Sequence, residues 1–135
     1  MERRYIFALA TLALGLALPT GARAQVDETA IDLGGEVVMR IRTGAGGFTA
    51  EQRADAVRAR LAPILGFTGL KAADVTVRQS RPGQDAAIYV RDHLLITVDR
   101  TLAAANGDTP QGLARVWAEK LRTVLPRVAA HPAQS

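Results

Sequence analysis

The stretch 86–99 (AAIYVRDHLLITVD) constrains the fold more than any other part of the chain. Apolar side chains alternate in 86–90 and again in 94–98, on either side of the polar pair 91–92. This spacing is typical of two antiparallel strands joined by a tight turn. We therefore expect a β-hairpin, with Asp99 ending the second strand and capping the helix that follows it.

Two more strands and a helix are predicted before the hairpin. Residues 35–42 alternate in the same way, and so do residues 74–79. Between them, Thr49–Gln52 has the form of a capping box, and apolar residues then recur at three- and four-residue spacing. We expect this helix to end near Leu61 or to kink there, because Pro63 disfavours its continuation.

Two helices are predicted after the hairpin. A short one spans 100–105 and ends at Asn106-Gly107, two residues that tolerate left-handed backbone angles. A longer one spans 110–127, with Pro110 at its favoured first position. Its core-facing stripe is predicted to contain Leu113, Val116, Trp117, Leu121, Val124 and Val128.

The order of these elements predicts an α+β domain. It is β-α-β-β-β-α, with the short extra helix before the last one. The first β-α-β unit is expected to return parallel through a right-handed crossover, and the other strands to follow as a meander. We therefore expect a four-stranded mixed sheet with the two main helices packed on one face.

The N-terminus has the layout of a secretory signal peptide. The charged segment Met1–Arg4 precedes the apolar run Tyr5–Leu18, and Ala22–Ala24 supplies small residues before a cleavage site. We expect cleavage between Ala24 and Gln25, and hence a periplasmic or secreted protein. A retained anchor is the alternative, although the run is shorter than the about 20 residues that span a bilayer. The two arginines of the first segment leave open the general or the twin-arginine export route.

The rest of the chain is expected to comprise a tether (25–34), one α+β domain (35–128) and a polar tail (129–135). The chain has 17 basic and 13 acidic residues, of which three basic and one acidic residue lie in the predicted signal peptide (1–24). The remaining residues therefore carry a net charge of only +2. Domains that bind nucleic acid carry a concentrated basic face, so we expect no nucleic-acid partner. The chain has no Cys and only two His, which excludes disulfides and thiol catalysis and predicts neither a metal site nor a cofactor.

The first candidate binding site is the glycine-rich segment TGAGGFT between a strand and a helix. Free backbone N–H groups at a helix N-terminus bind anions. The Lys-Ser/Thr of a P-loop is absent, and so is the G-x-G-x-x-G spacing. The alternative is an ordinary strand-to-helix connection. The candidate residues are Gly44, Gly46, Gly47 and Thr49.

The second candidate is a set of arginines, Arg40, Arg42 and Arg78, predicted to share the outer face of two strands. Such a stripe would meet anionic lipid headgroups, an acidic partner or a wall polymer. The alternative is a solvated face on which the arginines pair with nearby carboxylates. Peripheral contact with a membrane is left open by this pattern but is not predicted.

Enzymatic activity is not expected. The acidic residues and the histidine around the hairpin fall at exposed turn and cap positions, where no cleft would shift their pKa values apart. No Gly-x-Ser-x-Gly elbow is present for serine hydrolysis. The residues considered are Asp85, Asp92, His93 and Asp99.

Three segments together resemble a known family: GGFTAEQRADAVRARL (46–61), IYVRDHLLITV (88–98) and LARVWAEKLR (113–122). They are similar to the periplasmic domain that precedes the membrane helices in some small-conductance mechanosensitive channels, over about residues 35–128. A polar segment follows here instead of membrane helices, so a pore is not implied. The resemblance implies a non-enzymatic interaction or sensory module that binds another component of the cell envelope. The alternative is a binder of small anions or anionic lipid that uses the glycine-rich segment and the arginines.

Overall fold

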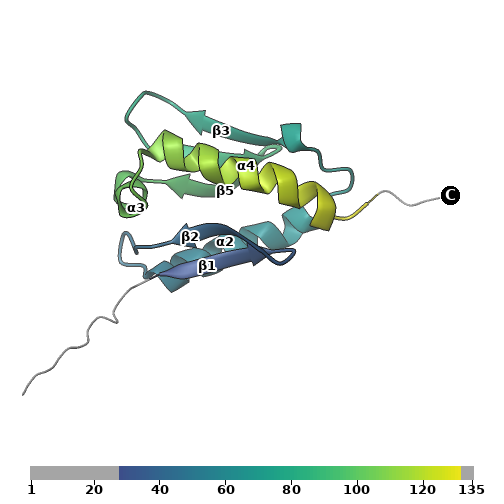
Figure 1. Cartoon of the computed structure of the whole chain (residues 1–135), viewed down its shortest axis with the longest axis horizontal. Helices are drawn as coiled ribbons and strands as arrows, with labels where there is room; N and C mark the ends of the chain where they lie inside the picture. Colours follow the sequence, from purple (N-terminus) through teal and green to yellow (C-terminus); the bar gives the residue numbers. More distant parts are fainter. Residues whose placement is uncertain (1–27, 132–135) are drawn as a thin grey trace, which may run out of the picture.

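The computed structural model describes residues 28–131, so the predicted signal peptide (1–24) and its cleavage site at Ala24–Gln25 lie outside the described residues. The described chain is mixed α and β, which confirms the predicted α+β class (Figure 1). No helix within it is both long and apolar enough to cross a membrane. The elements, including one short 3-10 helix (η4), are β1 (Thr29–Leu33), β2 (Glu36–Ile41), α2 (Ala50–Leu65), η4 (Ala72–Asp74), β3 (Val75–Gln79), β4 (Ala86–Val90), β5 (His93–Val98), α3 (Arg100–Ala105) and α4 (Pro110–Val128).

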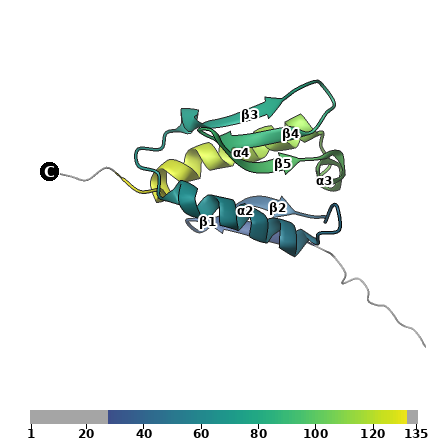
Figure 2. The same cartoon turned by 180° about the vertical axis from the view of Figure 1, so that it is seen from behind.

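The strands form two antiparallel sheets. β1 pairs with β2, and the other three strands pair in the order β3-β4-β5. The prediction of one four-stranded mixed sheet is therefore wrong for residues 28–131. β2 and β5 lie next to each other and point in the same direction, but no backbone ladder joins them (Figures 1 and 2). We call this boundary between β2 and β5 the seam.

Side chains of α2 occupy backbone groups that a ladder across the seam would use. Arg53 and Arg60 donate to the carbonyl oxygens of Thr97 and Leu95 on β5, each at 3.3 Å. A strand edge needs partners for its backbone groups, and guanidinium donors supply them here in place of a neighbouring strand. Guanidinium groups thus occupy carbonyl oxygens at this edge of β5. The strand at 74–79 (β3), which was predicted to return parallel to β2 in one sheet, pairs instead with β4 in the other sheet.

β1 lies in the segment expected to be a tether. Gly34 and Gly35 have φ values of +57° and +87° and join the two strands as a two-residue turn. The tightest hairpin turns require positive φ at both central positions, which glycine adopts without steric cost. The domain thus begins with a β-hairpin, one strand earlier than predicted.

The two main helices lie on opposite sides of the strands. Figure 1 shows α4 in front of β3, β4 and β5, and Figure 2, seen from behind, shows α2 in front of β1 and β2. α4 contacts all five strands, whereas α2 contacts β1, β2 and β5. The prediction that both helices pack on one face is therefore wrong, because the seam has two sides and each helix covers one of them.

The local signals for α2 are confirmed at its beginning but not at its end. The Thr49–Gln52 capping box forms in both directions, with N···O distances of 3.1 and 2.9 Å. The helix continues past Pro63 to Leu65 instead of ending near Leu61. Ile64 is buried, so packing against the core holds the last turn in spite of the proline.

The hairpin predicted in 86–99 is confirmed. Its turn is Arg91-Asp92, and Arg91 adopts a positive φ of 56°. Asp99 caps α3, because its Oδ1 accepts a hydrogen bond from the Leu102 N–H at 2.7 Å.

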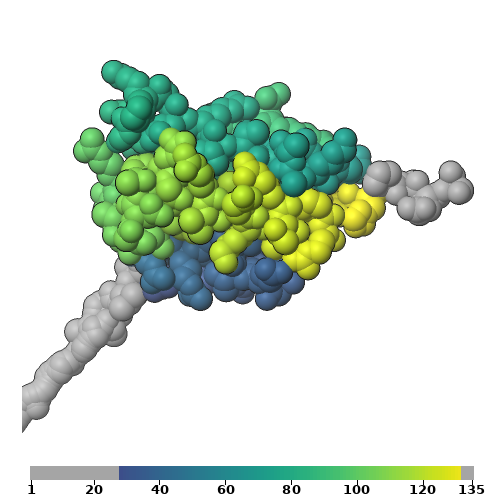
Figure 3. All heavy atoms as spheres, turned by 45° about the horizontal axis from the view of Figure 1, so that its top comes forward, coloured from purple at the N-terminus to yellow at the C-terminus, as the bar shows by residue number. Residues whose placement is uncertain are grey.

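α4 begins as predicted, with Thr109 as N-cap and Pro110 in its first turn. It lies at the surface along its whole length, drawn in green to yellow in Figure 3. Leu113, Trp117 and the other inward residues of α4 are buried. Val116 departs from the predicted stripe, because it is 48% exposed, and Val128 is only partly buried.

Candidate functional site

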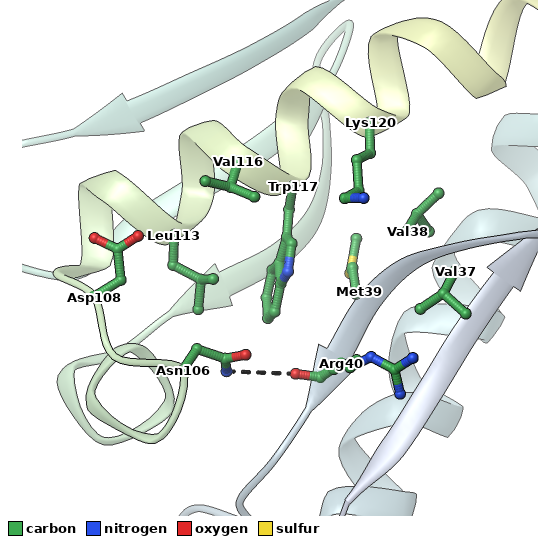
Figure 4. Close-up of a pocket in the computed structure, with 10 residues that line it drawn as sticks. All are labelled: Val37, Val38, Met39, Arg40, Asn106, Asp108, Leu113, Val116, Trp117 and Lys120. Atoms are coloured by element: carbon green, nitrogen blue, oxygen red, sulfur yellow. Dashed lines mark hydrogen bonds between the residues drawn. The ribbon is translucent and has the colours of Figure 1, made fainter.

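A groove lies between α4 and β2 on the front side of the seam (Figure 4). Its volume is about 360 Å³, which lies within the range of about 300–1,000 Å³ that is usual for ligand sites. We call it the α4–β2 groove. It is lined by Val37, Val38, Met39, Arg40, Asn106, Asp108, Leu113, Val116, Trp117 and Lys120.

A β-bulge shapes the strand side of the groove. Ile31 lies opposite Met39 and Asp32 lies opposite Val37, so Val38 has no cross-strand partner. An extra residue in one strand rotates the side chains that follow it. Val38 and Met39 are consequently both 1% exposed, while Val37 remains half-buried in the groove.

Asn106, at the end of α3, fixes one end of the groove. Its Nδ2 donates to the carbonyl oxygen of Arg40 at 3.4 Å, and its Oδ1 accepts from Arg42 Nε at 3.0 Å. The first of these bonds is drawn in Figure 4. One amide side chain therefore ties the α3–α4 connection to β2 across the seam.

The charged residues of the groove differ in whether they are paired. Arg40 forms an ion pair with Glu28 at 3.4 Å. Lys120 is exposed and has no ion pair with any residue in 28–131. Asp108 Oδ1 accepts from the Thr109 N–H at 2.7 Å. Lys120 is thus the basic residue of this groove that has no ion pair in the described part of the chain.

The structure separates the three arginines that were expected to share one face. Arg40 and Arg42 lie at the end of β2 and both bind Glu28. Arg78 lies on β3 in the other sheet, where it forms an ion pair with Asp92 at 3.6 Å and its guanidinium lies 3.8 Å from the centre of the Tyr89 ring. The expected common stripe is therefore not formed, because β2 and β3 belong to different sheets.

The glycine-rich segment forms a tight turn. Gly46 and Gly47 have φ values of +58° and +85°, and Ala45 and Phe48 exchange two backbone hydrogen bonds of 2.9 Å. A Cβ on Gly44 would overlap the Phe48 carbonyl oxygen, so glycine is required there. Thr49 and the third residue of α2 already use each other's N–H groups in the capping box. An anion at this end would have to use the remaining N–H groups.

The acidic residues around the β4–β5 hairpin do not converge. The Asp92 side chain is 99% exposed, and Asp99 is taken up by the α3 cap and by an ion pair with Arg53 at 3.3 Å. Within residues 28–131, no three His, Asp or Glu side chains are placed to hold a metal ion, and no charged residue is buried.

The groove residues differ from the candidates named from the sequence. Of those candidates, the groove contains only Arg40. Val116 and Trp117 were predicted to lie in the core, which is correct for Trp117, at 4% exposed, but not for Val116. The rarity of lysine could have drawn attention to Lys120, because the chain has only two lysines. Asn106 was predicted solely as a helix end, and its bonds to β2 depend on the tertiary structure.

No curated protein and no solved structure matches the chain significantly. A family model described as a domain of unknown function (DUF8459) matches residues 30–128. This match begins in β1 and ends at the last residue of α4, so it covers both sheets, both main helices and the groove between them. The chain therefore belongs to the DUF8459 family.

Proposed function

We propose that this protein is a non-enzymatic interaction module that binds another protein of the cell envelope through the α4–β2 groove. The observation that carries the proposal is the position of Val116. It continues the apolar stripe of α4, yet it is 48% exposed at the groove, which the half-buried Val37 also lines. An exposed large apolar side chain beside a groove, with polar residues around it, is a feature of protein interaction sites.

The charges of the groove suggest what the partner presents. Arg40 shares the Glu28 carboxylate with Arg42, whereas Lys120 has no ion-pair partner within residues 28–131. An incoming segment with an apolar anchor over Val116 and a carboxylate facing Lys120 would satisfy both. Such a charge at the edge of an interface contributes mainly to specificity and to the rate of association.

The sequence supports an address outside the cytoplasm for this module. The segment Met1–Ala24 has the pattern of a signal peptide, and residues 35–128 resemble a periplasmic domain of mechanosensitive channels. Both features favour a partner in the envelope, and the resemblance favours a sensory or interaction role. The proposal combines this address with the exposed groove.

Photocrosslinking in intact cells tests the proposal. Val116 is replaced by the photoreactive residue p-benzoylphenylalanine, and crosslinked products are identified by mass spectrometry. We expect a discrete adduct with one envelope protein. We also expect that adding Lys120→Glu reduces its yield by about tenfold, since one reversed charge changes an interface by about 1–2 kcal/mol.

The matched control carries the same photoreactive residue at Ala59, an exposed position of α2 that does not line the groove. Equal yields of the same adduct from positions 116 and 59 would show that crosslinking reflects random encounters and not specific binding at the groove. Recovery of only the free monomer from position 116, under several growth conditions, would contradict the proposal. An adduct between two copies of this chain would replace it with self-association.

A further inference from the structure

We propose that a second cavity, on the α2 side of the seam, binds a small amphipathic carboxylate, meaning one carboxylate group on a short apolar body. This cavity lies between α2 and β5 and has a volume of about 310 Å³. We call it the Phe48 cavity. The residues used in the argument are the apolar Phe48, Ala56, Val57 and Ile96 and the cationic Arg53 and Arg60, all of which line it. It shares no lining residue with the α4–β2 groove, so the inference does not depend on the proposed function.

The apolar wall of the cavity combines buried core residues with an aromatic residue whose backbone is fixed. Val57 and Ile96 are 1% and 3% exposed and contribute to the core-side wall. Phe48 is 59% exposed. Its backbone is nevertheless fixed, because the tight turn with Ala45 holds it with two hydrogen bonds of 2.9 Å. A fixed backbone that presents an aromatic ring to solvent beside a cavity offers contact area at a low entropic cost on binding.

The two arginines play different parts. Arg53 donates to the carbonyl oxygens of Thr43 and Thr97 and forms an ion pair with Asp99, so its charge is already neutralised. Arg60 donates one bond, to Leu95, and has no carboxylate partner within residues 28–131. A guanidinium group has five N–H donors in a fork that matches a carboxylate. Arg60 can therefore receive an anionic group while it keeps its bond to β5.

The size of the cavity sets the size of the ligand. At about 310 Å³ it lies at the lower end of the range for ligand sites, about 300–1,000 Å³. A short aliphatic or aromatic acid fits this volume, whereas a full-length lipid tail does not. The ligand would place its apolar body against Phe48 and its carboxylate on Arg60. A free acid and the surface of an anionic membrane could both offer such chemistry, and the test separates them.

Titration of the purified protein with octanoate, monitored by ¹H–¹⁵N NMR, tests the inference. We expect shifts at the amides of 46–48 and 96–97 and a Kd of about 1 mM, as befits a ligand of this size. 1-Octanol and acetate, which lack the charge and the chain respectively, are expected to bind about tenfold more weakly or not at all. Vesicles containing anionic lipid form the second arm.

Variants assign the binding to the two named groups. Arg60→Gln and Phe48→Ser are each expected to weaken octanoate binding by about tenfold. Arg58→Gln is the matched control, because Arg58 lies on the same helix but pairs with Glu51 and Asp55. Equal weakening by Arg58→Gln, or equal binding of 1-octanol, would overturn the inference. Binding to anionic vesicles without binding to octanoate would also overturn it and would assign the arginines to a membrane surface.

Discussion

The two sheets of this domain are stabilised in different ways. In the three-stranded sheet, β4 is bonded on both sides, and its Ile88 and Val90 are 0% exposed. In the two-stranded sheet each strand has one partner, and side chains bind the outer edges. Arg58 donates to the carbonyl oxygen of Ala30 on β1 at 3.1 Å, and Asn106 binds β2. Side chains also bind the edges of the three-stranded sheet, so the difference lies in the backbone: only that sheet contains a strand bonded on both sides.

This difference shows where the fold is vulnerable. A two-stranded hairpin is at best marginally stable alone in water. β1 and β2 are therefore held in place by packing against α2 and α4 and by the bonds across the seam. We expect substitutions at the seam to release the two-stranded sheet first, while the three-stranded sheet keeps its own ladder.

The largest effect is expected from Trp117→Ala. Trp117 is 4% exposed and projects from α4 toward β2 at the seam (Figure 4). Truncation of a buried tryptophan costs about 3–5 kcal/mol in the free energy of unfolding, which urea denaturation measures. Hydrogen exchange should show that β2 loses protection before β4.

Val116→Ala is the control for this change, because the neighbouring side chain is 48% exposed. It should cost less than about 1 kcal/mol. Equal protection of β2 and β4 in the Trp117→Ala variant would show that the two sheets unfold as one unit, and the contrast drawn above would then fail.

A smaller loss is expected from Arg53→Met. The Arg53 side chain is only 14% exposed and joins the end of β2 to β5 through the carbonyl oxygens of Thr43 and Thr97. Loss of hydrogen bonds to a charged group costs about 1.5–3 kcal/mol, which thermal or urea denaturation measures. Arg58→Met should cost less, about 1 kcal/mol, since its ion pairs are exposed and it loses only one bond to a strand, that to the carbonyl oxygen of Ala30. A greater loss for Arg58→Met would mean that the outer edge, and not the seam, holds the smaller sheet.

The smallest effect is a difference between two glycine turns. Gly34 and Gly46 have nearly equal φ values of +57° and +58°. A Cβ on Gly34 would lie 2.6 Å from Val128 Cγ1, whereas a Cβ on Gly46 would meet nothing within 4 Å. Alanine at either position should cost about 1–2 kcal/mol through left-handed strain.

Gly34→Ala should cost about 1 kcal/mol more than Gly46→Ala, because only Gly34 packs under the end of α4. Paired urea denaturation curves measure the difference directly. No difference would indicate that the turn of the β1–β2 hairpin is not pressed against the helix, which would weaken the view that α4 stabilises the smaller sheet.

The sequence predicted local structure better than the pairing of strands. The Thr49 cap, the Asp99 cap and the 86–99 hairpin all depend on neighbouring residues, and the structure confirms each of them. Strand partners depend on contacts between distant segments, which alternation alone does not specify. β1 was missed although Gly34-Gly35 after an alternating segment is itself a hairpin signal.

The groove could be predicted only in part. Val116 has the spacing of a core residue, yet it is 48% exposed, so the helical period alone placed it on the wrong side of the boundary between core and surface. The groove also depends on the bulge at Val38, which alters the faces of β2. The separation of Arg78 from Arg40 follows from sheet order, which the sequence pattern did not contain.

The arginines on the strand edges also affect how the protein behaves at high concentration. Arg122 donates twice to Val75 on β3, at 3.1 and 3.0 Å, and other arginines bind carbonyl oxygens of β1 and β5. Only two of the 17 basic residues are lysine. A guanidinium group can bond an edge carbonyl and still carry its charge in water. An edge that is both occupied and charged is a poor template for a strand of another copy. The arginines therefore disfavour amyloid-like aggregation, in addition to keeping the surface hydrated.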